Sequence, residues 1–369
     1  MTSGKVTLLQ VARAAGVSRS TAARTLGGYG SVDPALRTRV LEAARAMGYR
    51  ANSLARSVSS GRSHTIGVVV SDIENPHFSR AVRGIADVAR ASGFDVILVN
   101  TDEKLDLERE ALTTLLDKRV DGLIVAPSTG TASDHLQDAL DMNRSVVLLD
   151  RSLPNLDCDW IGVDDYDATT QIVNAVADAG HQNVCLIAAT SQTPAAIASH
   201  TATPISPIAE RIRALHETAE ARGMQAQVLT GAMSRERTRE VMRTALHQSP
   251  PPTAIIGSYS ELVMTMLEEL YSTGWRIPEE LSVASLDDAR WMALTSPPVT
   301  AARRPSYQLG ARATEILVQR LAGEGPLEQQ HLLPVQMAWR GSIGPAPQSQ
   351  LARHRLATVQ QPQTAVSQT

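Results

Sequence analysis

The side chains best suited to binding chemistry in this sequence come directly after short apolar segments. Asp150 and Arg151 follow VVLL, Asp287 follows SVASL, and Phe78 comes shortly after TIGVVVS. Carboxylate and guanidinium groups take the vicinal hydroxyls of a sugar or nucleoside in pairs, and an apolar ring stacks on its face. This combination predicts a binding site for a small polar metabolite. The candidate residues are Asn75, His77, Phe78, Asp150, Arg151, Arg211, Asp287 and Trp291.

Each candidate also has a purely structural interpretation. An aspartate that ends a strand often caps the next helix, and Arg211, within AERIRAL, can be a solvated helix residue. As a set, the candidates favour a binding site.

The sequence has no constellation typical of an enzyme or a metal site. It lacks a nucleophile elbow and a phosphate-binding glycine loop, and its nine histidines are not paired at metal-ligand spacing. Cys158 and Cys185 are too few for a metal centre and suit a reducing compartment. We therefore predict no catalytic residues, no metal and no cofactor. An enzyme of the same fold class is the least favoured alternative.

Most of the chain alternates short apolar segments with helical stretches. The segments are TIGVVVS, DVILVN, GLIVAP, SVVLLD, NVCLIAA, TAIIGS and LSVASLDD. Short apolar runs that are each followed by a helix are typical of parallel strands buried on both faces. They predict a doubly wound α/β body, which binds ligands at the carboxyl ends of its strands. Periodicity alone leaves open whether the body has one lobe or two.

The N-terminal segment has a different pattern, that of two short helices joined by a tight turn. Thr7 can cap the first helix, Gly16 ends it, and Ser18 can cap a second helix over residues 19–26. The predicted buried faces comprise Leu8, Val11, Ala12, Ala15, Ala22, Ala23 and Leu26. The second helix would keep Arg19, Ser20 and Arg24 outside.

A third helix follows, with Asp33 as its N-cap, Pro34 at its first position and Gly48 at its end. Three small helices of this kind are typical of a helix-turn-helix domain, whose second helix lies in the DNA major groove. An ordinary helical hairpin with a charged, solvated face is the alternative. The predicted buried stripe of the third helix is Leu36, Val40, Leu41, Ala44 and Met47.

The charge distribution favours the DNA-binding interpretation. Residues 1–63 hold ten Lys or Arg and two acidic residues, a net charge of +8, whereas the remaining residues hold 25 basic and 36 acidic residues. Such an asymmetry within one chain indicates a polyanionic partner for the basic part. The net charge of −3 for the whole chain conceals it.

The sequence resembles the LacI family of bacterial transcriptional regulators. The matching segments are VTLLQVARAAGVSRSTAARTL, VDPALRTRVLEAARAMGYRAN, SLARSVSSGRSHTIGVVV, DIENPHF, RVDGLIVAPS, VVLLDRS, RIPEELSVASLDD, SPPVTAARRP and WRGSIGP. They occur in the family's order over nearly the whole chain. Gln10, Ala23 and Ala51 depart from the usual Asp, Ser and Pro.

The resemblance implies a head over residues 1–50, a linker over 51–63 and a two-lobed, periplasmic-binding-protein-like body over 64–344. The chain would cross between the lobes near residues 162, 293 and 326. The first lobe would then comprise about 64–162 and 293–326, and the second about 163–292 and 327–344. Residues 345–369, rich in Gln, Pro, Ala and Thr, are predicted to be disordered.

The resemblance also implies that a homodimer reads pseudo-palindromic operator DNA. The predicted DNA-binding residues of the head are Thr7, Ser18, Arg19, Ser20, Thr21 and Arg24. In the family the linker forms a short helix on the operator, and Val58 stands where a Leu usually wedges into a base step. A flexible tether is the alternative. The predicted DNA-binding residues of the linker are Asn52, Ala55, Arg56 and Val58.

In the family, the positions matching Phe78, Asp150, Arg211 and Asp287 line an effector cleft. We add Tyr259 to the candidates, although it and Ser260 replace the Asn or Gly followed by Asp of many relatives. The loop over residues 190–209 is longer than usual and is either a lid or a surface insertion. These departures leave open which effector binds and whether it releases or strengthens DNA binding.

We therefore predict a bacterial DNA-binding regulator, a repressor controlled by a small polar effector. The chain has no apolar run of about 18 residues and no signal peptide, which predicts a cytoplasmic protein without a membrane partner. A sugar-binding protein of the transport type is the main alternative, and the basic head disfavours it. The last residues lack several leucine heptads, which favours a dimer over a tetramer.

Overall fold

The computed structural model describes residues 6–27, 30–49, 62–193, 205–324 and 330–347 of the 369-residue chain. Its head contains the three expected helices, which are α1 (Leu8–Ala14), α2 (Arg19–Gly27) and α3 (Pro34–Ala46). The predicted caps are present: Thr7 Oγ1 accepts the N–H of Gln10, and Ser18 Oγ accepts that of Thr21. The carboxylate of Asp33 accepts the N–H of Ala35.

The core of the head is small and consists mainly of alanine and valine, as the pattern predicts. Leu41 is a correction, because it is 47% exposed instead of buried. Val40 and Ala44, four residues apart, form the buried face of α3, and Leu41 points away from them. The buried residues are Val11, Ala12, Ala15, Ala22, Val40 and Ala44.

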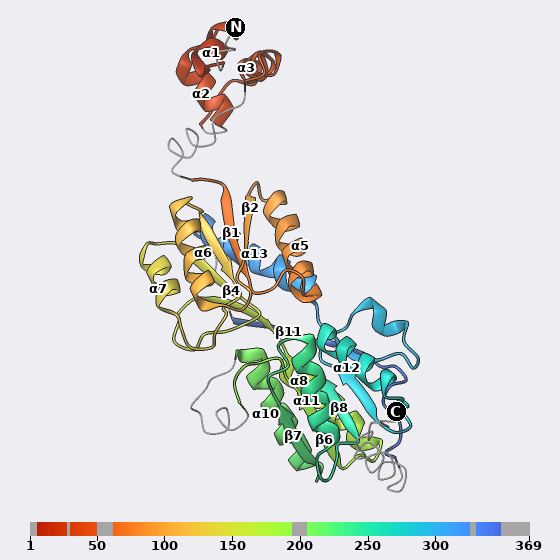
Figure 1. The fold of residues 1–369 in the computed structure, drawn as a ribbon. Helices are drawn as coiled ribbons and strands as arrows, with labels where there is room; N and C mark the ends of the chain where they lie inside the picture. Colours follow the sequence, from red (N-terminus) through yellow and green to blue (C-terminus); the bar gives the residue numbers. More distant parts are fainter. Residues whose placement is uncertain (1–5, 28–29, 50–61, 194–204, 325–329, 348–369) are drawn as a thin grey trace, which may run out of the picture.

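The described part of the body contains two six-stranded sheets, one in each lobe (Figure 1). The first sheet has the order β11-β5-β4-β3-β1-β2 and is parallel throughout. Its strands are β1 (Thr65–Val70), β2 (Asp95–Asn100), β3 (Gly122–Val125), β4 (Ser145–Leu149), β5 (Asp159–Val163) and β11 (Gln330–Leu333). Its helices are α5 (Pro76–Ala91), α6 (Leu105–Asp117), α7 (Asp134–Asp141) and α13 (Ser306–Ala322).

The second sheet has the order β12-β10-β9-β8-β6-β7 and is parallel except for the pair β10 and β12. Its strands are β6 (Asn183–Ile187), β7 (Gln225–Leu229), β8 (Ala254–Gly257), β9 (Ser282–Ser285), β10 (Thr300–Arg303) and β12 (Gln336–Ala338). Its helices are α8 (Asp165–Asp178), α10 (Ser206–Ala221), α11 (Arg235–Leu246), α12 (Ser260–Ser272) and the 3-10 helix η1 (Arg290–Ala293).

Three segments carry the chain between the lobes, and two of them lie later than predicted. The first crossing follows β5, close to the predicted residue 162. The second follows β10, at residues 304–305 instead of 293, and the third follows β11, at residues 334–335 instead of 326. The prediction missed the short strands β10 and β11, whose pairing with β9 and β5 assigns them to their lobes.

The end of the body extends slightly further than predicted. The structure describes residues up to 347, and the N–H of Ala346 donates to the carbonyl of Ala179. His181 holds the preceding turn: its Nε2 lies 3.0 Å from the Gly344 carbonyl oxygen and 3.0 Å from Ser282 Oγ. Residues 345–347 are therefore not part of a disordered tail, and residues 348–369 lie outside the described range.

His181 gives the first testable prediction, which concerns the pH dependence of stability. Its side chain is buried, and burial lowers its pKa below the ordinary value. The unfolded chain therefore takes up a proton at a higher pH than the folded chain. As the pH falls below about 6.5, protonation of unfolded His181 reduces the free energy of unfolding.

The measurement is urea denaturation of His181→Gln and the wild type between neutral and mildly acidic pH. At neutral pH the variant should lose about 1–3 kcal/mol of stability. That deficit should shrink as the pH falls, whereas His216→Gln, at an exposed position, should match the wild type at every pH. A deficit that stays constant with pH would contradict the prediction.

Candidate functional site

A cavity of about 360 Å³ lies between the two lobes, at the carboxyl ends of their strands. Asp72 follows β1, Asp150 follows β4, Ser258 follows β8 and Asp287 follows β9, and all four line the cavity. Arg304, directly after β10, also lines it. The parallel strands of both sheets therefore direct polar side chains into one space, as expected for doubly wound sheets.

The structure brings most of the predicted effector-binding residues together in this cavity. Trp291 lies elsewhere, contrary to the prediction, because η1 packs its side chain against the core of the second lobe. Trp291 follows Asp287 by four residues but does not line the cavity with it. The predicted residues that line the cavity are Asn75, His77, Phe78, Asp150, Arg151, Arg211, Tyr259 and Asp287.

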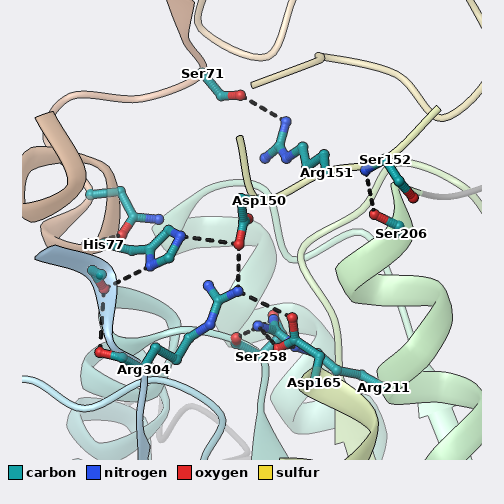
Figure 2. Close-up of polar contacts among 12 residues, drawn as sticks. Ser71, His77, Asp150, Arg151, Ser152, Asp165, Ser206, Arg211, Ser258 and Arg304 are labelled. Carbon is teal, nitrogen blue, oxygen red and sulfur yellow. Dashed lines mark hydrogen bonds and ion pairs between the residues drawn. The ribbon is translucent and has the colours of Figure 1, made fainter. Parts of the chain in front are cut away.

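Asp150 is at the centre of a buried ionic network (Figure 2). Its Oδ1 accepts from Nη2 of Arg304 at 2.6 Å and lies 3.2 Å from His77 Nε2. Burial by itself would raise the pKa of Asp150, but the charges of Arg304 and Arg151 and the contact with His77 outweigh burial and place this pKa well below its usual range. Asp150 is therefore an ionised acceptor at neutral pH.

Arg211, on the first turns of α10, is held from the second-lobe side of the cavity. Its Nε and Nη2 donate to Asp165 Oδ1 at 2.8 and 2.6 Å, and its Nη1 donates to the Ser258 carbonyl at 2.7 Å. These bonds fix the plane of the guanidinium and leave two of its five N–H groups for a ligand. Arg211 is thus a buried, preorganised donor instead of a solvated helix residue.

Arg151 has a comparable role on the first-lobe side. Its guanidinium forms a bidentate pair with Glu103, at 2.7 and 2.6 Å, and also donates to Ser71 Oγ at 2.7 Å. It lies 5.4 Å from the centroid of the Phe78 ring, within the range of a cation–π contact. Burial alone would lower the pKa of Arg151, but the charge of Glu103 raises it. This cation therefore orients the ring that would stack on a ligand.

Asp287 and Asp288 are neighbours with opposite surroundings. Asp288 is held by the guanidinium of Arg340, at 2.8 and 2.9 Å, and by Arg303 at 3.3 Å. In the described part of the chain, no side chain or N–H group donates to the carboxylate of Asp287, whose backbone N–H bonds Ser285. Burial raises the pKa of Asp287. Asp287 is therefore a buried acceptor with capacity for ligand hydroxyls.

Several residues of the cavity were not predicted. Asp72 and Arg304 follow their strands within two residues, so the strand-end signal used for Asp150 could have found them. Glu103 lies beyond β2 at a positive φ of 59°, and no local pattern indicates its pairing with Arg151. Residues 206–209 of the predicted loop over 190–209 belong instead to α10, and residues 194–204 lie outside the described ranges. The described residues of this stretch that line the cavity are Thr190, Ser191, Gln192, Ile205, Pro207 and Ile208.

The head presents the second helix of its helix-turn-helix as predicted. Arg19, Ser20 and Arg24 are exposed on α2. Ser18 Oγ lies 2.9 Å from Thr21 Oγ1, so the cap also holds the next polar side chain of the helix. The predicted linker residues lie outside the described range; they are Asn52, Ala55, Arg56 and Val58.

Comparison with known protein families decides the classification. The family model described as "Bacterial regulatory proteins, lacI family" matches residues 7–52, which contain the three helices of the head. The model described as "Periplasmic binding proteins and sugar binding domain of LacI family" matches residues 63–337. The chain belongs to the LacI family. It is a DNA-binding transcriptional regulator with a periplasmic-binding-protein-like body, and not an enzyme.

Individual relatives support this LacI-family assignment. The chain is 30% identical to the HTH-type transcriptional regulator PtxS of Pseudomonas aeruginosa, over 93% of this chain and 97% of that protein. It is 29% identical to the ribose operon repressor of Bacillus subtilis, over 85% of this chain and 90% of that protein. The crystal structure of the Lac repressor dimer bound to operator and an anti-inducer has the same fold. Its TM-score is 0.78 at 24% identity, over 92% of this chain and 99% of that one.

Two further findings concern the described residues alone. No helix among them is long and apolar enough to span a membrane. No group of three or more His, Cys, Asp or Glu side chains in the described ranges is arranged to hold a metal ion.

Proposed function

We propose that the cavity between the lobes is the effector site of this LacI-family repressor. A small polyhydroxylated compound bound there would change the affinity of the head for its operator. The observation that carries the proposal is the buried carboxylate of Asp287, which has no donor partner among the described residues and lines one cavity with ionised Asp150 and three oriented guanidinium groups. A hydroxylated ligand supplies the donors and acceptors that these groups need.

The proposed ligand class follows from the charges in the cavity. Arg151, Arg211 and Arg304 are each already paired with a carboxylate. Asp287 has no such partner in the described structure. The free capacity therefore combines the acceptor oxygens of Asp287 with the remaining N–H groups of Arg211 and Arg304, and hydroxyl groups, which both donate and accept, suit it. A sugar, a nucleoside or a related polyol fits this donor set.

A thermal-shift screen tests this proposal. Full-length protein is screened against pentoses, hexoses, disaccharides, nucleosides and purines, because a ligand of the native state raises its apparent stability. Each hit is then tested for its effect on binding to a duplex selected by the protein from random DNA. Hits that stabilise the protein without changing DNA binding would favour a storage or transport role and contradict a regulatory one.

On the DNA side, we propose that α2 lies in the major groove and that Arg19 and Ser20 contact base edges. Both residues are exposed at the N-terminal end of the helix, where helix-turn-helix proteins read their sites. Arg24, one turn later, would contact phosphate or a base near the edge of the half-site. The linker residues named above complete the proposed DNA contacts, and the regulator would work in the cytoplasm.

We further propose that the protein acts as a dimer on a pseudo-palindromic operator, with β2 in the interface. This strand is the edge of the first sheet, is partly exposed along its length, and presents Leu98 at 39% exposure. An unprotected apolar edge strand is normally covered by another element or another chain. A second copy would cover it here.

Leu98→Asp is expected to convert the dimer into a monomer, because it buries a carboxylate without a partner at the interface. Loss of the second half-site contact should weaken operator binding roughly 100-fold or more. The matched control is Leu332→Asp, on strand β11 at the opposite edge of the same sheet and 55% exposed. Light scattering that finds Leu98→Asp still dimeric would rule out β2 as the interface.

A further inference from the structure

Arg304 occupies a special position in the chain, on the second of the three segments that join the lobes. It directly follows β10 of the second lobe and comes two residues before α13 of the first lobe begins. Its side chain is only 6% exposed, whereas that of its neighbour Arg303 is 57% exposed. Two adjacent arginines therefore have opposite environments, and only Arg304 lines the cavity.

The guanidinium of Arg304 binds one carboxylate from each lobe (Figure 2). Its Nη2 donates to Asp150 Oδ1 at 2.6 Å and to Asp165 Oδ2 at 3.1 Å. Asp150 ends β4 in the first lobe, and Asp165 is the first residue of α8 in the second. All three groups are buried, so water screens this bridge weakly.

The bridge is incomplete as a hydrogen-bonded network. Among the described residues, the buried Nε of Arg304 has no hydrogen-bond partner, whereas Nε2 of His77 lies 3.2 Å from Asp150 Oδ1. A buried donor without an acceptor costs free energy, so the arrangement depends mainly on the attraction of Arg304 to the two carboxylates. Hydroxyl groups that donate to Asp150 would compete directly with this attraction.

The first lobe connects Arg304 to the base of the DNA linker. Helix α13 begins at the cavity, where Ser306 Oγ lies 2.9 Å from His77 Nδ1, and its 17 residues span about 25 Å. At its other end, the carbonyl of Leu321 accepts from Nη2 of Arg62 at 2.7 Å. Arg62, near the end of the predicted linker over 51–63, is the first described residue after the gap at 50–61. A shift at the start of α13 therefore reaches the point where the linker joins the lobe.

The packing of α13 supports movement as a rigid unit. A Cβ at Gly310 would lie 1.9 Å from the backbone oxygen of Ala81 on α5, so the two helices touch backbone to backbone. The point where the linker joins the first lobe is also held in place, because the carboxylate of Asp121 accepts from the N–H groups of Ser63 and His64 at 2.7 and 2.8 Å.

We propose that Arg304 is the positioning residue that holds the two lobes in the arrangement required for operator binding, and that a compound in the cavity weakens this hold by competing for Asp150. The second half rests on the proposed function and implies that the bound effector releases the operator. The first half concerns the protein without any ligand and can be tested by itself.

The test uses full-length Arg304→Ala and a duplex selected by the wild-type protein from random DNA. Affinity for this duplex should fall at least tenfold, with less than a twofold change on random DNA. Millimolar ethylguanidinium, which replaces the missing group, should restore most of the affinity. Arg303→Ala, the matched control, should keep wild-type affinity and show no response to ethylguanidinium. Full operator affinity in a folded Arg304→Ala protein would overturn the proposal.

A second measurement reports the lobe arrangement directly. Spin labels are placed at Met142→Cys, at the end of α7, and Glu220→Cys, on α10; both positions are exposed, and the native Cys158 and Cys185 are buried. With labelled protein diluted in unlabelled protein, Arg304→Ala should broaden the distance distribution and Arg303→Ala should not. An unchanged distribution in Arg304→Ala means that Arg304 does not hold the lobes.

If Arg304→Ala does not fold, Arg304→Lys takes its place, because it keeps the charge but lacks the guanidinium whose Nη2 reaches both carboxylates. It should show an intermediate loss of operator affinity, and wild-type affinity would overturn the proposal. None of these measurements uses an effector. A sugar screen without hits would therefore refute the proposed function and leave this result unaffected.

Discussion

Asp287→Asn is expected to weaken binding of the effector found in the sugar and nucleoside screen by about 1.5–3 kcal/mol, or roughly 10- to 150-fold. Asparagine keeps the shape of the side chain. It replaces a charged carboxylate, which can accept from two hydroxyls, with a neutral amide that has one acceptor oxygen. Because Asp287 has no donor partner among the described residues, the substitution breaks no internal bond of its side chain. The fold and the operator affinity without ligand should both stay unchanged.

Asp288→Asn is the matched control for Asp287→Asn. It changes the adjacent residue in the same way but breaks the internal pairing with Arg340 and Arg303. It should lower thermal stability and leave ligand affinity within a factor of about three. Titration calorimetry separates the two variants. If Asp287→Asn binds as well as the wild type, the ligand lies elsewhere.

Arg19→Ala has the largest expected effect on the DNA side. It should cost about 1–3 kcal/mol on the selected duplex and much less on random DNA, because a base contact contributes only at the correct sequence. Arg19 is exposed at the first position of α2, and Ser18 caps the helix in front of it. The substitution therefore removes a contact without disturbing the head.

Arg24→Ala is the comparison for Arg19→Ala on the same helix. If Arg24 contacts phosphate, its loss should weaken binding to both duplexes by similar factors and reduce the salt dependence of binding. If Arg19→Ala also loses equal affinity for the selected and the random duplex, Arg19 contacts only the DNA backbone. That result would contradict its proposed role in reading bases.

Local patterns predicted the head and most of the cavity well. The caps formed by Thr7, Ser18 and Asp33 depend on residues within three positions of each other, so the sequence shows them directly. The strand-end position of Asp150 and Asp287 follows from the alternation of strands and helices. Parallel strands bring these ends to one edge, whatever the details of packing.

Long-range pairing explains what the sequence did not show. Arg304 meets Asp150 and Asp165 across 154 and 139 positions of the chain, and Arg151 meets Glu103 across 48. No local pattern encodes such partners. The crossing segments were misplaced for the same reason, because β10 and β11 are short and are recognisable as strands only through their neighbours in the sheet. The prediction that Trp291 lines the cavity was wrong because η1 packs its side chain against the second-lobe core.

The most direct test of the central claim, that occupancy of the cavity controls the head, is a closed thermodynamic cycle. Operator affinity is measured with and without a saturating hit from the screen, and affinity for that hit is measured with and without operator. The account predicts two equal ratios that differ clearly from one, because coupling between sites is reciprocal. In Asp287→Asn, the same ligand concentration should change operator affinity much less, because the ligand then occupies less of the cavity. Ratios of one in the wild-type protein, at full occupancy of the cavity, would contradict the account.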